Sequence, residues 1–190
     1  MKDRIILDLC GGTGSWSKPY TDAGYDVRVI DPLANGTDVR LYKLTKEKIH
    51  GILAAPPCTH FSGSGARWWA SKGPEALLEG LSVVDACLRI VMITNPTWWV
   101  LENPVGRLSQ YLGKPKFYFN PNEFGGYLDP PGDAYTKKTA LWGNFNRPLY
   151  KHVDPIEGSK MHKLPPGPDR WRLRSMTPQG FARAFKESNP

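Results

Sequence analysis

Short apolar runs alternate with polar, helix-like stretches along the first half of the chain. Residues 4–9 (RIILDL) and residues 26–31 (DVRVID) are two such runs, and each predicts a short β-strand. Residues 50–58 (HGILAAPPC) predict a third strand, which two prolines end, and residues 98–104 (WWVLENP) predict a fourth. Between these last two strands, residues 75–93 suit a long helix that packs on the core.

This alternation of strands and helices favours an α/β fold with a mostly parallel, doubly wound sheet. In such sheets a ligand binds outside the carboxyl ends of the strands. The motifs that follow the predicted strands should therefore converge at one edge of the sheet.

The pattern of hydrophobic positions is weaker in the second half of the chain. Residues 116–126 (KFYFNPNEFGG) and 135–143 (YTKKTALWG) are candidates for later strands. Residues 144–170 show no period and contain several breakers, so they predict an excursion over the surface. Residues 177–188 predict a final helix that is capped by Thr177.

The composition fits one folded domain that spans residues 1–190. Hydrophobic residues make up 40% of the chain and charged residues 23%, which excludes the composition of disordered chains. The length suffices for one hydrophobic core and is short for two. The 19 glycines and 18 prolines predict many turns and loops, where binding sites are commonly built.

Charge and cysteine content narrow the class of protein. The net charge of +7 would attract a polyanion such as nucleic acid, although many proteins are basic for solubility alone. The three cysteines show no CxxC spacing, which argues against a metal site and a disulfide scaffold and fits a reducing cytoplasm. The first residues lack the pattern of a signal peptide. Residues 76–93 contain charged residues, which argues against a membrane span.

The first candidate site is the glycine-rich segment 8–14 (DLCGGTG), which follows the first predicted strand. Glycines let the backbone approach a ligand closely, and Asp31, at the end of the second strand, can accept hydrogen bonds from a ribose. The spacing predicts an adenosine-type cofactor, but it also suits a nicotinamide cofactor or a turn without a ligand. Asp38 is a candidate for an adenine contact or for a simple Asx turn.

The second and third candidate sites follow the third and fourth predicted strands. Most single cysteines are inert core residues, but Cys58 follows two stiff prolines at the ligand-facing edge of the sheet. The loop 59–69 (THFSGSGARWW) after it suits a flap over DNA or an ordinary loop. Glu102 ends the next strand, and a carboxyl group beside a thiol offers an acid matched to a nucleophile.

Four segments, LDLCGGTG, AAPPCTHFS, LENP and RSMTPQGFARAF, follow one another in this order and span most of the chain. Together they resemble the successive motifs of the DNA cytosine C5-methyltransferase family. The resemblance implies a Rossmann-like fold that uses S-adenosylmethionine, in one catalytic domain that acts as a monomer on cytosine-containing DNA. It also implies the cytoplasm of a bacterial or phage-infected host cell.

The resemblance assigns roles to individual residues. Cys58 would be the nucleophile, Glu102 would engage the edge of the cytosine, and Lys137 would support the catalytic site. S-adenosylmethionine would contact Asp8, Cys10, Gly11, Gly12, Gly14, Asp31, Asp38 and Pro56. The DNA would contact Pro57, Ser62, Arg67, Asn103, Lys138 and Thr139.

The chain also departs from the family pattern. Lysines in residues 135–139 (YTKKT) stand where the family has an arginine-rich triplet, and Lys does not replace Arg in a bidentate contact. Pro104 replaces the common Val after Glu-Asn, and Leu9-Cys10 replaces a Phe of the first motif. The large insert with which the family reads DNA sequence is absent, and residues 144–170 are a short substitute.

Other functions share part of this pattern. An RNA cytosine methyltransferase would use the same residues, and a DNA-binding or regulatory module could keep the fold without the activity. An amino-group methyltransferase would place Asp or Asn and an aromatic residue around the proline pair, where Cys58 stands here. A nicotinamide-dependent oxidoreductase would have no need of a Pro-Pro-Cys strand end.

Overall fold

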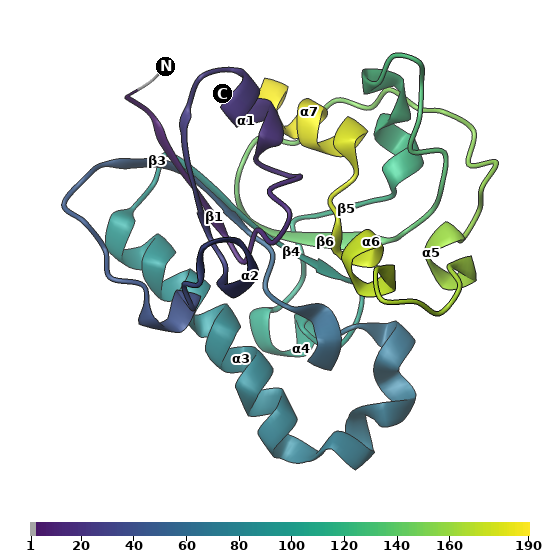
Figure 1. Cartoon of the computed structure of the whole chain (residues 1–190), viewed down its shortest axis with the longest axis horizontal. Coiled ribbons are helices and arrows are strands. Elements are labelled where there is room, and N and C mark those ends of the chain that lie inside the picture. Colours follow the sequence, from purple (N-terminus) through teal and green to yellow (C-terminus); the bar gives the residue numbers. More distant parts are fainter. Residues whose placement is uncertain (1–2) are drawn as a thin grey trace.

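A six-stranded sheet forms the centre of the computed structural model, which describes residues 3–190 (Figure 1). The strands are β1 (Ile5–Leu9), β2 (Asp26–Ile30), β3 (Ile49–Ala54), β4 (Trp98–Pro104), β5 (Phe117–Phe119) and β6 (Thr139–Asn144). Their order in the sheet is β2-β1-β3-β4-β6-β5. β1 to β4 are parallel, β6 is antiparallel to β4, and β5 is antiparallel to β6. The predicted α/β class and mostly parallel sheet are confirmed.

Helices cover both faces of this sheet. The α-helices are α1 (Lys18–Asp22), α2 (Pro32–Asn35), α3 (Trp69–Thr94), α4 (Ser109–Leu112), α5 (Lys160–Lys163), α6 (Arg170–Ser175) and α7 (Gln179–Ser188). The 3-10 helices are η1 (Val39–Leu41), η2 (Cys58–His60), η3 (Gly63–Trp68) and η4 (Pro121–Tyr127). α3 packs on one face, whereas α1 and α7 lie side by side on the other (Figure 1).

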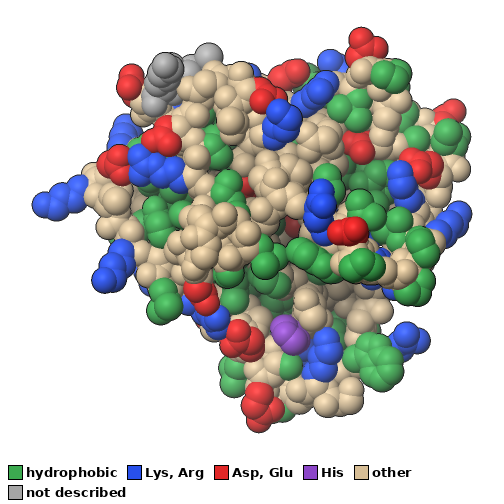
Figure 2. Space-filling model, viewed as in Figure 1, with side chains coloured by type: hydrophobic (Ala, Val, Ile, Leu, Met, Phe, Trp, Pro, Cys, Tyr) green, Lys and Arg blue, Asp and Glu red, His purple; other side chains and the backbone are tan. Residues whose placement is uncertain are grey.

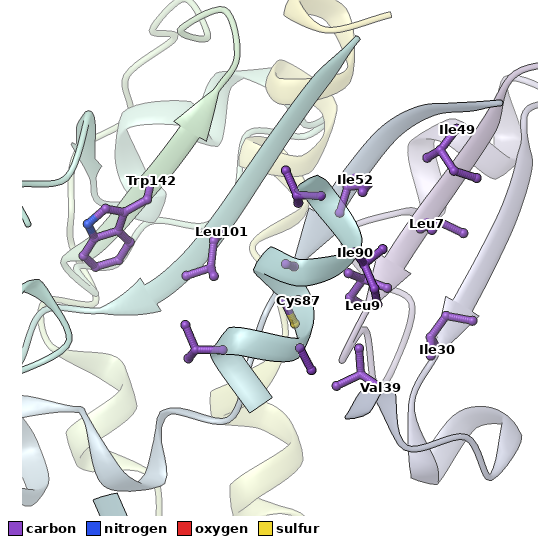
Figure 3. Packing of buried hydrophobic residues seen from close by; sticks show 14 of the residues in the cluster. Leu7, Leu9, Ile30, Val39, Ile49, Ile52, Cys87, Ile90, Leu101 and Trp142 are labelled. Atoms are coloured by element: carbon purple, nitrogen blue, oxygen red, sulfur yellow. The ribbon is translucent and has the colours of Figure 1, made fainter. Parts of the chain in front are cut away.

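The face under α3 is packed with aliphatic side chains (Figure 3). Leu7 and Leu9 of β1 are fully buried in one cluster with Cys87 and Ile90 of α3. Ile6 belongs to the cluster on the opposite face, because successive side chains of a strand alternate between faces. Each fully buried Leu or Ile stabilises the fold by about 1.5–3 kcal/mol, so this packing fixes α3 on the sheet.

The opposite face is packed mainly with aromatic side chains. Phe181 of α7 stacks on Phe119 of β5 with 3.8 Å between ring centroids. Trp98 of β4 stacks on Tyr20 of α1, with 5.5 Å between ring centroids, and also contacts Phe185 of α7. The helix at the end of the chain is therefore part of the core.

Parallel pairing brings the predicted motifs to one edge of the sheet. β3 lies between β1 and β4, and Ala54 pairs with Leu9 on one side and with Leu101 on the other. The glycine-rich segment, the Pro-Pro-Cys segment and Glu102 therefore occur where three adjacent strands end. The predicted convergence of the three motifs is confirmed.

The predicted helix 75–93 lies within α3, which begins earlier, at Trp69. The first turn is separated from the rest by Gly73, whose φ of 73° and ψ of 178° are not helical. Pro74 follows this break, so the straight part of the helix starts close to the predicted residue.

Two predictions for the second half of the chain are wrong in detail. The strand predicted over residues 116–126 ends at Phe119, because Asn120 and Glu123 form a reciprocal capping box that begins η4. The last helix is preceded by Pro178 as its cap residue, in an extended conformation, and Thr177 does not cap it. Residues 144–170 contain one short helix, α5, and their first half runs along η4 through backbone hydrogen bonds.

Across residues 3–190, none of the helices has the length and apolarity that crossing a bilayer requires. Residues 1 and 2, which belong to the segment without a signal-peptide pattern, lie outside the described residues.

Gly51 of β3 offers a test of this packing. A Cβ atom at this position would lie 2.2 Å from the indole ring of Trp98, so Gly51→Ala requires the ring to move. We expect a loss of about 1–3 kcal/mol in the free energy of unfolding, measured by urea denaturation. The control is Gly167→Ala, where the added Cβ meets no atom within 4 Å, and its effect should stay within about 0.5 kcal/mol. Equal stabilities of the two variants would contradict the packing described.

Candidate functional site

The first part of the site is the segment that leaves β3. The backbone N–H of Ala55 donates to the carbonyl of Leu9, which continues the pairing with β1 beyond the strand. Pro56 is buried, Pro57 is exposed and non-helical, and Cys58 begins η2 with an exposed side chain. The two prolines thus carry the chain out of the sheet and present Cys58 at its edge.

The second part of the site is the end of β4. Asn103 is fully buried, and its Nδ2 donates a hydrogen bond of 2.9 Å to the carbonyl of Pro56. This bond joins the segment before Cys58 to the strand that carries Glu102. Asn103, predicted to contact the substrate, therefore lies behind the site, where it fixes one strand end against the other.

Burial and charge set the protonation of the two reactive groups. Burial raises the pKa of Glu102, and the positive charge of Lys137 opposes this. The pKa of Cys58 is raised by the protein around its thiol and by the negative charge of Glu102, while Lys137 and Arg174 lower it. The pair therefore favours a neutral thiol beside a carboxyl group that binds a proton more readily than an exposed one.

Lys137, Lys138 and Thr139, the three predicted site residues near the start of β6, lie in different surroundings. Lys137 lies close enough to Cys58 and Glu102 to act on the pKa of both, and its Nζ donates to the carbonyl of Arg174 at 2.7 Å. Thr139 is buried, and its hydroxyl donates to the carbonyl of Lys137. Lys138 is exposed, with its Nζ 5.5 Å from the ring centroid of Tyr118. Of these three, Lys137 is the side chain that the structure brings to the Cys58–Glu102 pair.

The loop after Cys58 is anchored at its base to the segment after Glu102. Arg107 matches none of the sequence motifs, yet its backbone N–H donates to Phe61 O, and its Nε donates to His60 O at 2.7 Å. Its guanidinium also lies 4.7 Å from the ring centroid of Trp69. Gly106 is required here, because a Cβ would lie 1.9 Å from the carbonyl oxygen of Phe61. The sequence feature that could have indicated this anchor is the pair Gly106-Arg107, which follows LENP after one intervening residue.

The tip of this loop is exposed and carries the other two predicted substrate contacts. Ser62 is half-buried, and its hydroxyl hydrogen-bonds that of Ser64 at 2.9 Å. Arg67 is exposed and lies over the ring of Trp68, 5.1 Å from its centroid. Both residues belong to the segment that connects Cys58 to α3, and the backbone N–H of Ser62 donates to the carbonyl of Cys58 at 2.9 Å.

The glycine-rich segment after β1 needs its unusual composition. Cys10, Gly12 and Gly14 have φ values of 58°, 50° and 66°, a region that favours glycine. At Gly11 the limit is space, because a Cβ would lie 2.4 Å from the carboxyl carbon of Asp8. The segment is therefore a tight turn, and its glycines are half-buried.

Asp8 lies buried under this turn. One carboxyl oxygen accepts a hydrogen bond of 2.5 Å from the hydroxyl of Ser17, and the other, Oδ1, has no partner. Burial raises the pKa of Asp8 to about 7, against the effect of Ser17 and with a smaller contribution from Asp31. A buried carboxyl oxygen without a partner fits a cofactor that brings a hydrogen-bond donor or a positive charge.

Two further acids border the turn. Asp31 accepts hydrogen bonds from the backbone N–H groups of Gly12, at 3.0 Å, and Leu33, at 2.8 Å, so it caps α2 and holds the turn. Asp38 caps η1 and pairs with Arg40, which lowers the pKa of Asp38. Asp31 is thus fixed beside the turn, whereas Asp38 is engaged by a cation of its own segment.

The end of the chain also reaches the glycine-rich turn, a contact that sequence reasoning missed. The backbone N–H of Thr177 donates to the hydroxyl of Ser15 at 3.0 Å, and Nε2 of Gln179 donates to the backbone carbonyl of Ser15 at 2.8 Å. Within residues 3–190 no group of three His, Cys, Asp or Glu side chains is arranged to hold a metal ion. The site therefore consists of a thiol, a carboxyl group, a lysine and a glycine-rich turn.

No protein-family model matches the chain, and no curated protein matches it in sequence. Solved structures do match, and one is a protein encoded within an E. coli prophage and assigned as a DNA modification methyltransferase. The TM-score is 0.51 at 17% sequence identity, over 80% of this chain and 52% of that one. The likeness shows that the two proteins share a fold, and this chain spans about half the length of that protein.

The opposed charges around Cys58 predict how its reactivity depends on pH. Iodoacetamide reacts with the thiolate, and the pKa of Cys58 is raised. The rate of Cys58 alkylation should therefore increase at a higher pH than the rate for an ordinary thiol, whose pKa is about 8.5. Glu102→Gln removes a negative charge and should shift the profile to lower pH. Lys137→Gln removes a positive charge and should shift it to higher pH.

Mass spectrometry of the Cys58 peptide measures this alkylation, and the buried Cys87 in the same sample is the internal control. Shifts of the same sign in both variants, or none, would contradict the described electrostatics.

Proposed function

We propose that this protein transfers a methyl group from S-adenosylmethionine to C5 of cytosine in DNA. The observation that carries the proposal is the placement of Cys58 and Glu102 at the ends of neighbouring parallel strands, joined by the bond from Asn103 to Pro56. The glycine-rich turn ends the next strand of the sheet. The fold shared with a protein assigned as a DNA modification methyltransferase supports methyl transfer to DNA.

The chemistry explains why a thiol and an acid are needed together. C5 of cytosine is a weak nucleophile, so Cys58 would first lose its thiol proton to solvent, and the thiolate would form a bond from Sγ to C6 while Glu102 gives a proton to N3. The ring then carries electron density at C5, which would take the methyl group as its bond to the sulfonium breaks and leaves a neutral thioether. A base removes the proton from C5, the bond from Sγ to C6 breaks, and N3 returns its proton to Glu102. The raised pKa of Glu102 suits a group that must carry this proton near neutral pH.

Lys137 has a positioning role in this proposal. Its positive charge lowers the pKa of Cys58 and that of Glu102, so it favours the thiolate that attacks C6. Its Nζ is held by the carbonyl of Arg174. A lysine held in this way supplies charge next to the reacting groups without a bidentate contact.

S-adenosylmethionine supplies an electrophilic methyl group on a sulfonium when it is bound. Gly11, Gly12 and Gly14 would hold it through the backbone of the turn, and Asp31 would accept from its ribose. The partnerless buried oxygen of Asp8 supports a positively charged or donating group at this place. Cys10 and Pro56 border the same edge of the sheet, whereas Asp38 would have to share its carboxyl group with Arg40.

The DNA must give up the stacking of the target base, because C6 and N3 are not accessible to a side chain inside a duplex. We propose that one domain, residues 1–190, does this, with residues 144–170 in place of a larger recognition domain. Pro57, Ser62 and Arg67 would contact the extruded nucleotide from the Cys58 side, and Lys138 would contact the backbone.

Covalent trapping tests the proposed nucleophile. A fluorine at C5 cannot leave as a proton does, so the bond between Cys58 and C6 should persist when DNA containing 5-fluorocytosine is the substrate. We expect a denaturation-resistant complex in the presence of S-adenosylmethionine, with the adduct located by mass spectrometry on the peptide that contains Cys58. Glu102→Gln should slow its formation by roughly 10²–10⁴-fold, the usual contribution of a general acid.

The matched variants are Cys58→Ala, which should form no complex, and Cys87→Ala, which should form it as the unmodified protein does. Cys87 is buried in α3, so its substitution could disturb the fold. Thermal unfolding is therefore measured for both variants, to show that each is folded. Methylation of DNA by folded Cys58→Ala would exclude the mechanism and favour transfer to an amino group. A complex with RNA in place of DNA would show an RNA cytosine methyltransferase.

A further inference from the structure

The short helix α6 combines exposed aromatic and basic side chains. Residues 169–176 (DRWRLRSM) contain three arginines and one acid. Trp171 is 59% exposed, Leu173 is 46% exposed, and Arg172 is exposed between them. In the described part of the chain none of these arginines forms an ion pair. α6 therefore presents charge and apolar surface that the folded protein itself does not use.

The carboxyl end of α6 is fixed beside the reactive groups. The carbonyl of Arg174 accepts the hydrogen bond from Lys137, and the charge of Arg174 contributes to the pKa of Cys58. Two residues after the helix, the N–H of Thr177 binds the hydroxyl of Ser15 in the glycine-rich turn. The segment of α6 and Thr177 thus borders both halves of the site.

The sides of α6 that face the rest of the protein are not closely packed. Hollows of about 190 Å³ and 270 Å³ adjoin it, and Leu164 and Leu173 line both. Figure 2 shows hydrophobic side chains in a ridge over the loop that precedes α6, and again over η3. On η3, Arg67 lies over the exposed Trp68. Exposed Arg and Trp residues therefore occur both on α6 and on the loop that begins at Cys58.

The side chains identify the class of partner. A face that serves solubility carries mixed charges and few exposed tryptophans. Arginine binds phosphate oxygens with a planar, bidentate geometry, and aromatic rings offer a surface on which nucleobases stack. The partner that matches both properties next to this site is a nucleic acid strand.

We propose that α6 is a DNA-contacting element, in which Arg172 binds a backbone phosphate and Trp171 stacks on a base beside the extruded cytosine. This inference rests on the proposed function, because DNA is the substrate there. It places the contact outside residues 144–170, the short substitute for the insert that reads DNA sequence, and adds it to the backbone contact proposed for Lys138.

The test separates binding from chemistry by using the whole 190-residue chain with Cys58→Ala. Its affinity for a fluorescent, cytosine-containing duplex is measured by anisotropy over a series of salt concentrations. Arg172→Gln should weaken binding and reduce the slope of log K against log salt by about 1, as expected for one lost phosphate contact. Trp171→Ala should weaken binding about 5- to 100-fold, with the slope unchanged, and Trp171→Phe should restore part of the affinity.

Lys46→Gln is the matched control for charge. Lys46 is exposed and precedes β3, so it lies at the amino edge of the sheet, opposite to Cys58, and its loss should leave the slope nearly unchanged. Because Trp171 and Arg172 are exposed, both variants should unfold at the temperature of the parent. Equal effects of Arg172→Gln and Lys46→Gln, or unchanged affinity of Trp171→Ala, would overturn the inference.

The same variants with Cys58 intact separate this inference from the proposed function. With 5-fluorocytosine DNA, they should form the covalent complex slowly at low DNA concentration and at the normal rate at saturation. If the protein with α6 intact forms no complex, yet the α6 variants lose DNA binding, the proposed function fails and the DNA contact stands. If the protein with α6 intact forms the complex, and the α6 variants form it at the same rate at every DNA concentration, the proposed DNA contact is wrong and the proposed function stands. Tighter binding of an RNA duplex of the same sequence would also overturn the assignment to DNA.

Discussion

The hydrogen bond from Asn103 to the carbonyl of Pro56 joins the two strand ends on which the site is built. Parallel pairing of β3 and β4 brings these ends together, but it leaves the chain free to diverge beyond the last paired residues, Ala54 and Leu101. The Asn103 side chain holds the segment after β3 in place, and two prolines make that segment stiff. This buried contact and the anchoring of the Cys58 loop by Arg107 together hold Cys58 and Glu102 at a fixed spacing.

The electrostatics of the site follow from the same arrangement. The surrounding protein raises the pKa of both the Cys58 thiol and the Glu102 carboxyl group, and the negative charge of Glu102 raises that of the thiol further. The positive charge of Lys137 opposes the shift on each. Lys137 is in turn held by the backbone of α6. Lys137, which lowers the pKa of Cys58 and Glu102, is therefore held by the same helix that we propose to contact DNA. A movement of α6 on DNA binding would change the position of Lys137 and with it the reactivity of Cys58.

The sequence predicts the features that local pattern determines. Alternating apolar runs predict the sheet, and the residues that end each run predict the edge where Cys58, Glu102 and the glycine-rich turn meet. Contacts between distant segments leave no such pattern. The anchoring of the Cys58 loop by Arg107, the bond from Lys137 to Arg174 and the contact of Gln179 with Ser15 arise only when the chain is folded. The capping box at Asn120, in contrast, has a local signature that the strand prediction overlooked.

The identity of the methylated atom tests the proposed function most directly. DNA incubated with the protein and isotope-labelled S-adenosylmethionine is digested to nucleosides, which are separated by liquid chromatography and identified by mass spectrometry. The arrangement of Cys58 and Glu102 predicts that the label appears in 5-methyl-2′-deoxycytidine. Label in N4-methyl-2′-deoxycytidine or N6-methyl-2′-deoxyadenosine, with none at C5 of cytosine, would contradict it.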